Sequence, residues 1–91
     1  MGEARESFEI INKLGMHARA ATKLVQMASR YRSEVMIEKD GHTANAKSVM
    51  GVLLLCGSKG TLLDVEATGQ SADEAVQTIG KLIYDRFGEE E

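Results

Sequence analysis

The stretch of the chain best suited to chemistry is GMHARAATKLVQMAS, residues 15–29. His17 lies directly before an apolar pattern of helical period, and Arg19 follows two positions later. The first N–H groups of a helix lack partners within it, and the helix dipole there favours negative charge by about 0.3–1 kcal/mol. A neutral imidazole at such an end can act as a nucleophile, and a guanidinium can pair with phosphate. The pair fits a histidine that accepts a phosphoryl group, but the same spacing also fits a polar turn residue followed by a solvated arginine.

Ser48 begins a second segment of interest, SVMGVLLLCGSKG, residues 48–60. A serine at a helix N-cap is explained by the helix start alone, where its side chain contributes roughly 1 kcal/mol. The functional interpretation is a phosphorylation site, because phosphate adds about −1.5 to −2 charge and is tolerated at a helix N-terminus. Spacing alone leaves both interpretations open.

A metal site in this chain would have to come from His17, His42 and Cys56. Their spacing matches no usual ligand pattern, so we expect neither a metal ion nor another cofactor. A single cysteine excludes a disulfide within the chain and fits a reducing cytosol.

Length and charge limit the class of protein. The chain has 91 residues, which suits one domain over 1–91, and 43% apolar and 27% charged residues are typical of a globular protein. The net charge of −3 argues against a nucleic-acid-binding surface. The N-terminus lacks the pattern of a secretory signal, and the longest apolar run, VMGVLLLC, is too short for a bilayer. We therefore expect a cytoplasmic protein with no membrane insertion.

The elements that must position the histidine and the serine follow from hydrophobic periodicity. Strands are expected at 7–12, 34–39, 42–47 and 62–68. The dipeptide Asp40-Gly41 predicts a tight hairpin turn between the second and third strands.

Two long amphipathic helices are predicted, one between the first and second strands and one after the fourth strand. The helix that begins at Ala18 has an apolar face formed by Ala21, Leu24, Val25, Ala28 and Tyr31. The sequence SADE at 71–74 predicts a capping box for the other helix. The apolar face of that helix consists of Ala75, Val76, Ile79, Leu82, Ile83 and Phe87. The acidic tail, residues 88–91, is expected to fray.

The period of the segment after Ser48 is ambiguous. We interpret Val49–Leu55 as a short helix with Ser48 at its N-cap, and a buried strand is the alternative. Apolar residues occupy more than one face of this helix. If the helix lies on the surface, Met50 and Leu53 cannot all be buried with Val49, Val52 and Leu54. Core filling is one explanation; the other is an apolar docking patch that includes Met16, and the two can share residues.

The expected order of elements is β-α-β-β-α-β-α. It predicts an α+β fold, an open-faced β-sandwich with a four-stranded antiparallel sheet. The helices, two long and one short, would cover one face of the sheet and leave the other face in water.

The segments LGMHARAAT and KSVMGVLLL together resemble the two signature segments of HPr, the histidine-containing phosphocarrier family of the bacterial phosphoenolpyruvate-dependent phosphotransferase system. The resemblance covers nearly the whole chain, and its size, element order, hairpin and spacing between His17 and Ser48 all fit. One motif alone would be weak. Two motifs at the family spacing outweigh the purely structural interpretations of His17 and Arg19.

The resemblance implies a phosphocarrier rather than a stand-alone enzyme. Phosphorylated enzyme I would phosphorylate His17 on Nδ1, and the group would then pass to the A domain of an enzyme II or to a regulatory relative. Arg19 would support the phosphoryl group during transfer. Ser48 would match the serine that an ATP-dependent HPr kinase/phosphorylase modifies. The carrier is expected to be a monomer.

The resemblance also implies an apolar surface around the histidine on which partners dock, formed by Met16, Ala20, Val49, Met50 and Leu53. The family usually has proline where this chain has Ala20. Because proline fixes φ in the first turn of a helix, we expect alanine to leave the fold intact and to make the site less rigid. The resemblance gives no function for the cysteine near this surface.

Three alternatives to a sugar-uptake carrier have different consequences. A regulatory paralogue, acting mainly through Ser48 phosphorylation and protein binding, would share all these residues. A non-catalytic binding module predicts that replacing His17 has no effect on function. A split β-α-β RNA-binding domain would need aromatic side chains stacked on its sheet, and the aromatic residues are only Phe8, Phe87, Tyr31 and Tyr84.

Overall fold

The computed structural model describes residues 2–55 and 57–91 of the chain. The strands are β1 (Gly2–Glu9), β2 (Glu34–Lys39), β3 (His42–Asn45) and β4 (Leu62–Gly69). The helices are α1 (Ala18–Ala28), α2 (Val49–Leu55) and α3 (Ala72–Tyr84), followed by the 3-10 turn η1 (Arg86–Gly88). The predicted order of elements is therefore confirmed, with η1 added after α3, and α2 is a helix rather than a buried strand.

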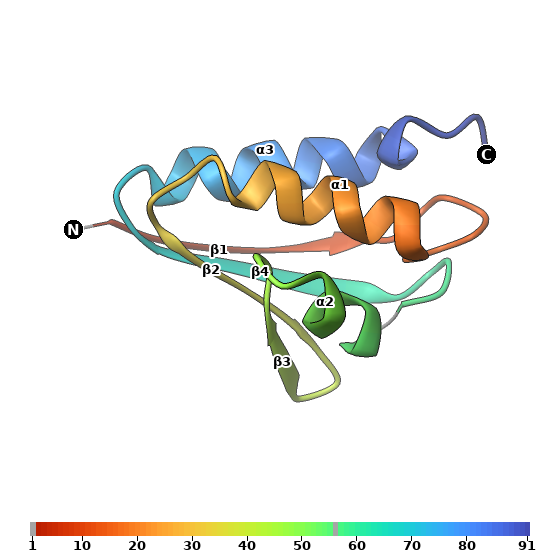
Figure 1. The fold of residues 1–91 in the computed structure, drawn as a ribbon, viewed down its shortest axis with the longest axis horizontal. Coiled ribbons are helices and arrows are strands. Elements are labelled where there is room, and N and C mark those ends of the chain that lie inside the picture. The colour runs from red at the N-terminus through yellow and green to blue at the C-terminus, as the bar shows by residue number, and fades with distance from the viewer. Residues whose placement is uncertain (1, 56) are drawn as a thin grey trace.

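The four strands form one antiparallel sheet in the order β1-β4-β2-β3. Figure 1 shows α1 and α3 together on one side of this sheet. The predicted α+β open-faced sandwich is confirmed. Its two edge strands are β1 and β3, and the polar β3 suits an edge position.

The sheet is apolar on the helix side and charged on the other. Alternate residues of the central strands are buried beneath the helices, namely Val35, Ile37, Leu63, Val65 and Ala67. On the uncovered side, Arg5 forms ion pairs with Asp64 at 2.9 Å and Glu66 at 3.3 Å. Glu38 of β2 joins the same cluster at 3.4 Å from Arg5.

The predicted apolar faces of both long helices lie in the core. In α1, Ala21, Leu24 and Ala28 are buried. In α3, the predicted positions Ala75, Val76, Ile79 and Ile83 are buried, and so is Phe87 of η1. Gly80 of α3 lies directly against the ring of Phe8, so the packing of α3 on β1 leaves no room for a side chain there.

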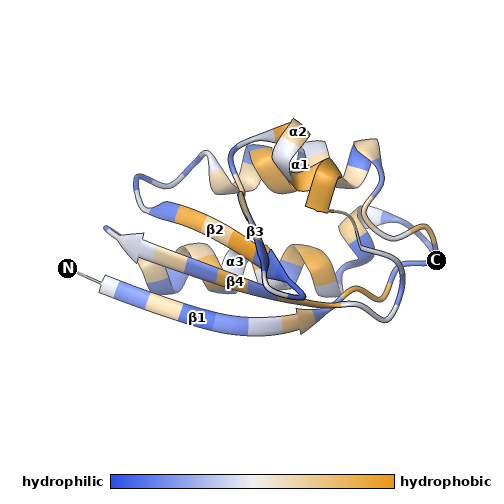
Figure 2. Ribbon diagram, turned by 90° about the horizontal axis from the view of Figure 1, so that it is seen from below, coloured by the Kyte–Doolittle hydropathy of each residue, from blue (hydrophilic) through white to orange (hydrophobic). Residues whose placement is uncertain are grey.

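The prediction of a first strand over 7–12 is wrong, because β1 covers Gly2–Glu9. Charged residues dominate the first half of this edge strand, so the sequence lacks the apolar alternation that predicts a strand. Figure 2 shows the largely hydrophilic colours of β1. Beyond β1, Ile10 is no longer part of the strand, and its N–H donates to the Thr61 carbonyl over 2.9 Å.

The third strand ends earlier than predicted, at Asn45. The side-chain oxygen of Asn45 accepts a hydrogen bond from the Lys47 N–H over 2.8 Å, which starts a turn.

The predicted capping box of α3 is also wrong. Ser71 lies at the N-cap in the left-handed region, with φ 61° and ψ 31°, and its side chain makes no capping hydrogen bond. A capping box requires extended backbone at the N-cap, and the tight turn from β4 after Gly69 does not allow it. The acidic residues Asp73 and Glu74 still lie in the first turn, where the helix dipole favours them.

We expect Asp64 to make the stability of the fold depend on acid pH. The hydrogen bond from Ser7 lowers the pKa of Asp64, burial opposes this, and Arg5 lowers it further, so the net pKa lies below the ordinary value. A carboxyl group of lowered pKa adds stability above its unfolded pKa, and that stability is lost as pH falls through the folded pKa. Asp64→Asn should therefore flatten the decline in the free energy of unfolding below about pH 4.

Urea denaturation at a series of pH values measures this slope. Glu34→Gln is the matched control, since Glu34 is exposed on β2 and has no side-chain partner among the described residues. The control should keep the wild-type slope, and a wild-type slope in Asp64→Asn would contradict the prediction.

Candidate functional site

His17 lies at the N-cap of α1, as the sequence indicated. Its backbone is extended, with φ −99° and ψ 179°, and its carbonyl accepts the first helical hydrogen bond, from Ala21 N–H, over 2.8 Å. The His17 side chain does not cap the helix and is 29% exposed. The ring is thus accessible to solvent beside a helix N-terminus.

Backbone hydrogen bonds hold the loop before α1 in place. The Gly15 N–H donates to the Asn12 carbonyl over 3.1 Å, and the Met16 N–H donates to the Gly57 carbonyl over 2.7 Å. Gly15 has φ 69°, in the left-handed region that favours glycine, and the Gly57 carbonyl lies where a side chain at Gly15 would project. The glycine of the histidine motif is therefore required for both conformation and space.

A carboxylate contacts the imidazole on one side. His17 Nε2 makes a hydrogen bond with Glu89 Oε2, and the other oxygen, Oε1, accepts from Asn12 Nδ2 over 3.0 Å. Asn12 is completely buried, and its Nδ2 also donates to the Gly15 carbonyl over 2.8 Å. Sequence reasoning missed Asn12 and Glu89, because they lie far apart in the chain and neither belongs to a recognisable motif.

The C-terminal segment is packed against the site, in contrast to the expectation that residues 88–91 fray. Figure 1 shows it beside the loop that precedes α1. Phe87 is buried and its carbonyl accepts from Lys23 Nζ over 2.5 Å. The Lys13 N–H donates to the Glu91 carbonyl. Composition suggested a solvated acidic tail, but the buried Phe87 directs the following residues back over the loop.

The contacts of Glu89 change its acidity. Burial raises the pKa of Glu89, but hydrogen bonds from His17 and Asn12 lower it, and so do the charges of His17 and Lys23. The net pKa lies below the ordinary value. Glu89 is therefore ionised at neutral pH and can only accept hydrogen bonds, which makes His17 Nε2 the donor.

Arg19 lies in the first turn of α1, two residues after His17. Its side chain is exposed and makes no ion pair or hydrogen bond with any residue that the structure describes. An unpaired guanidinium beside the histidine is free to contact an anionic group.

Ser48 lies at the start of α2, as predicted, and is partly buried. Its Oγ accepts from the Gly51 N–H over 3.1 Å, which is N-cap geometry. Helices α1 and α2 pack against each other, so the histidine and serine motifs belong to neighbouring elements.

The predicted docking residues divide into buried and exposed groups. Met16 is 7% exposed and Ala20 is completely buried, so these two predicted docking residues are not exposed at the surface. Met50 is 68% exposed, Val49 lies partly in solvent and Leu53 is half-buried. Two further exposed apolar residues, which the sequence reasoning did not select, are Leu14 before α1 and Leu54 in α2.

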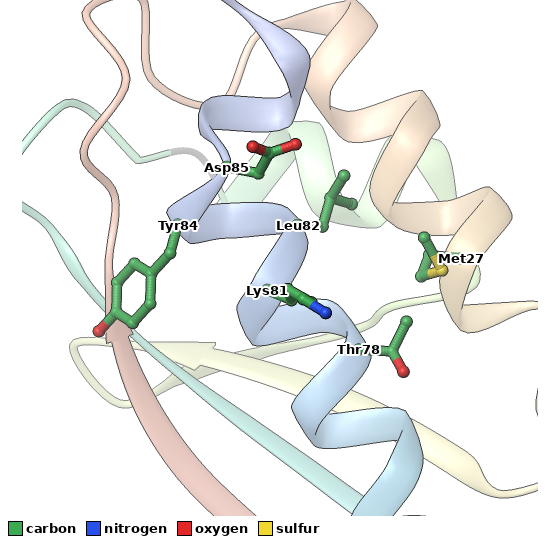
Figure 3. A pocket seen from close by; sticks show the side chains of 6 residues that line it. All are labelled: Met27, Thr78, Lys81, Leu82, Tyr84 and Asp85. Atoms are coloured by element: carbon green, nitrogen blue, oxygen red, sulfur yellow. The ribbon is translucent and has the colours of Figure 1, made fainter.

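An open groove between α1 and α3 contains none of the predicted site residues. Figure 3 shows Thr78, Lys81 and Leu82 of α3 and Met27 of α1 along it, with Tyr84 and Asp85 at the end of α3. Across residues 2–55 and 57–91, no group of three or more His, Cys, Asp or Glu side chains is placed to hold a metal ion. Cys56 lies outside the described residues. None of the described helices combines the length and the apolar character needed to cross a membrane.

Comparisons with known proteins identify the family of this chain. The family model "PTS HPr component phosphorylation site" matches residues 4–85. The phosphocarrier protein HPr of Neisseria meningitidis is 45% identical over 87 residues, which are 96% of this chain and 98% of that protein. The chain belongs to the HPr family, the histidine-containing phosphocarrier proteins of the bacterial phosphotransferase system, and the resemblance found in the sequence is confirmed.

Solved structures agree in fold. HPr-C-His from Thermoanaerobacter tengcongensis matches with a TM-score of 0.90 and 42% identity, and the match covers 100% of both chains. Crh, the catabolite repression HPr of Bacillus subtilis, matches with a TM-score of 0.74 and 40% identity over 80% of this chain and 84% of that one. That Crh structure is described as a domain-swapped dimer.

We expect His17→Ala to raise the pKa of Glu89 towards the ordinary value. The substitution removes both the hydrogen bond and the charge that His17 contributes, while burial, which raises this pKa, remains in part. Carboxyl carbon NMR of Glu89 during a pH titration measures the change. His42→Ala, at the other histidine, is the control and should leave the Glu89 titration unchanged. A Glu89 titration that is identical in His17→Ala and wild type would refute the contact.

Proposed function

We propose that this chain carries a phosphoryl group on His17, accepting it on Nδ1 from phosphorylated enzyme I and passing it to an enzyme II A domain or a regulatory relative. The observation that carries the proposal is a solvent-accessible imidazole at the N-cap of α1 in a member of a histidine phosphocarrier family. The proposed relay runs in the cytoplasm.

The surroundings of His17 suit a group that must stay reactive. The first-turn N–H groups of α1 point towards the site, and a helix N-terminus stabilises an anion by about 0.3–1 kcal/mol at an exposed position. So small a stabilisation leaves transfer in both directions accessible. We assign to Arg19 the role of pairing with the phosphoryl oxygens, since its guanidinium has no other partner among the described residues. Partner proteins would supply the remaining transition-state stabilisation.

Phosphorylation by enzyme I and phosphoenolpyruvate tests the carrier function. We expect intact mass to show one added phosphoryl group that is labile in acid and absent from His17→Ala. Arg19→Ala should still accept the group, with an initial rate lower by about tenfold, because one charge-assisted contact in the transition state is lost.

Two outcomes would favour other functions. If neither wild type nor His17→Ala gains mass with the cognate enzyme I, the carrier function is wrong. If ATP and an HPr kinase still modify Ser48 in that case, the regulatory function takes its place. A binding module without phosphotransfer predicts no modification at either residue.

The second candidate function is regulation through phosphorylation of Ser48. The observation in its favour is the hydroxyl of Ser48 at the start of α2, next to the exposed Val49 and Met50. A phosphate there would place about −1.5 to −2 charge beside these apolar side chains and alter partner binding more than the fold.

We further propose that the exposed apolar residues near the site form the docking surface for partners. Met50 and Leu54 are four residues apart on one face of α2, and Leu14 lies in the loop that carries the histidine motif. Exposed apolar side chains grouped around a reactive residue are typical of a protein interface.

We expect Met50→Ser to weaken the interaction with enzyme I by about tenfold, the loss typical of a residue at the centre of an interface. Kinetics of phosphorylation at varied carrier concentration should show a higher KM with little change in kcat, because binding rather than chemistry is affected. Leu62→Ser is the matched control, since Leu62 is 64% exposed on β4 and alternates with the buried Leu63. Equal KM values for the two variants would contradict this docking surface.

We propose that the carrier acts as a monomer. All eight residues of β1 pair with β4 of the same chain, so the sheet can be completed without a second copy. Because the related Crh structure is a dimer, the oligomeric state of this chain must be measured. Native mass spectrometry of the unphosphorylated protein provides that measurement.

A further inference from the structure

We propose that Glu89 is a positioning residue for phosphoryl transfer. Its carboxylate holds the Nε2–H of His17, so the other ring nitrogen, Nδ1, carries the lone pair that attacks phosphorus. The inference rests on the proposed carrier function and assigns a role in it to a residue outside both sequence motifs. Glu89 also lies beyond residues 4–85, the part of the chain that the family model matches.

Two hydrogen bonds, one on each oxygen, fix the carboxylate of Glu89. Oε2 contacts His17 Nε2, and Oε1 accepts from Asn12 Nδ2 over 3.0 Å. Asn12 is completely buried and is itself fixed by its bond to the Gly15 carbonyl over 2.8 Å. The side chain of Glu89 is only 17% exposed. Its orientation is therefore determined by the same loop that sets the position of His17.

The rest of the tail is anchored in the same way. Phe87 is buried in the core, and its carbonyl accepts from Lys23 Nζ of α1 over 2.5 Å. Two residues later the chain reaches Glu89. The following residue, Glu90, is exposed and makes no hydrogen bond or ion pair within the described part of the chain. The contact with the histidine is thus specific to one of three consecutive glutamates.

The hydrogen bond determines which nitrogen is nucleophilic. An ionised carboxylate can only accept, so Nε2 must carry a proton. In the neutral ring Nδ1 is then unprotonated, and it has no hydrogen-bond partner among residues 2–55 and 57–91. This arrangement, in which a carboxylate orients an imidazole and stabilises its charge, is the one that a catalytic triad uses.

In the transfer step one bond to phosphorus forms and one breaks, while Glu89 keeps its contact with the ring. The Nδ1 lone pair forms a bond to phosphorus of the donor phosphohistidine, while the donor nitrogen–phosphorus bond breaks and its electron pair stays on the donor ring. The Nε2 proton remains on His17, and the ring gains positive charge. Glu89 lies next to that charge, whereas the phosphoryl group is attached to the far nitrogen. The positive ring lies between Glu89 and the phosphoryl group and so separates the two negative groups, whose repulsion falls with distance.

The test compares Glu89→Ala and Glu89→Gln with the control Glu90→Gln. In wild type, ring proton NMR of unphosphorylated protein should show a His17 Nε2–H signal protected from solvent exchange. We expect Glu89→Ala to abolish this signal and Glu90→Gln to keep it. Glutamine at 89 can still accept from Nε2–H through its oxygen but lacks the charge, so Glu89→Gln should retain a weaker signal.

Transfer kinetics with phosphorylated enzyme I provide the second readout. We expect kcat to fall by about tenfold in Glu89→Ala and by less in Glu89→Gln. In Glu90→Gln, kcat should stay within about twofold of the wild-type value. KM should be unchanged in all three variants. A loss confined to KM would indicate a docking role and overturn the proposal. An unchanged kcat or an unchanged ring signal in Glu89→Ala would also overturn it.

The failure of the carrier function would look different. A wild type that accepts no phosphoryl group would remove the function proposed above. Loss of the ring signal in Glu89→Ala but not in Glu90→Gln would, in that case, still support the positioning of His17 by Glu89.

Discussion

The buried amide of Asn12 links the parts of this protein that form the site. It donates to the Gly15 carbonyl and to Glu89 Oε1, and so connects the loop before α1 to the C-terminal segment. A buried N–H group left without a partner costs about 1–3 kcal/mol, and these two bonds satisfy the Nδ2 group of Asn12. They fix a loop that has no regular structure, and the loop in turn sets where α1 begins and how His17 meets solvent.

The sheet and the helices beneath this loop form an apolar core that does not include the site, so the site can be exposed to solvent. Apolar residues of β2 and β4 are covered by α1 and α3, and the charged face of the sheet is left in water. His17 and Arg19 lie outside this core and remain accessible to solvent. A phosphocarrier needs this division, since a buried phosphoryl group could not be handed to a second protein.

The site combines a fixed part and an adaptable part. Glu89 is hydrogen-bonded to the imidazole, and Asn12 in turn holds Glu89 and the Gly15 carbonyl. The apolar side chains around the ring have no such directional constraint. Met50 and Leu54 extend from a short helix into solvent. Flexible apolar side chains can fit several partners, while the hydrogen bond to Glu89 limits the orientation of the imidazole. A relay protein that must meet both a donor and acceptors benefits from this combination.

Periodicity in the sequence was sufficient to predict the order of elements, the helix-covered sheet and most of the core, because alternating and helical patterns are local properties. The motifs around His17 and Ser48 were sufficient to indicate the family. Local patterns failed at β1, where edge position and cross-strand ion pairs of Arg5 replace apolar alternation, and at Ser71, where the turn from β4 determines the backbone. Only the tertiary structure brought Glu89 to His17 and buried Ala20 and Met16, because these relations depend on packing between segments that are distant in the chain.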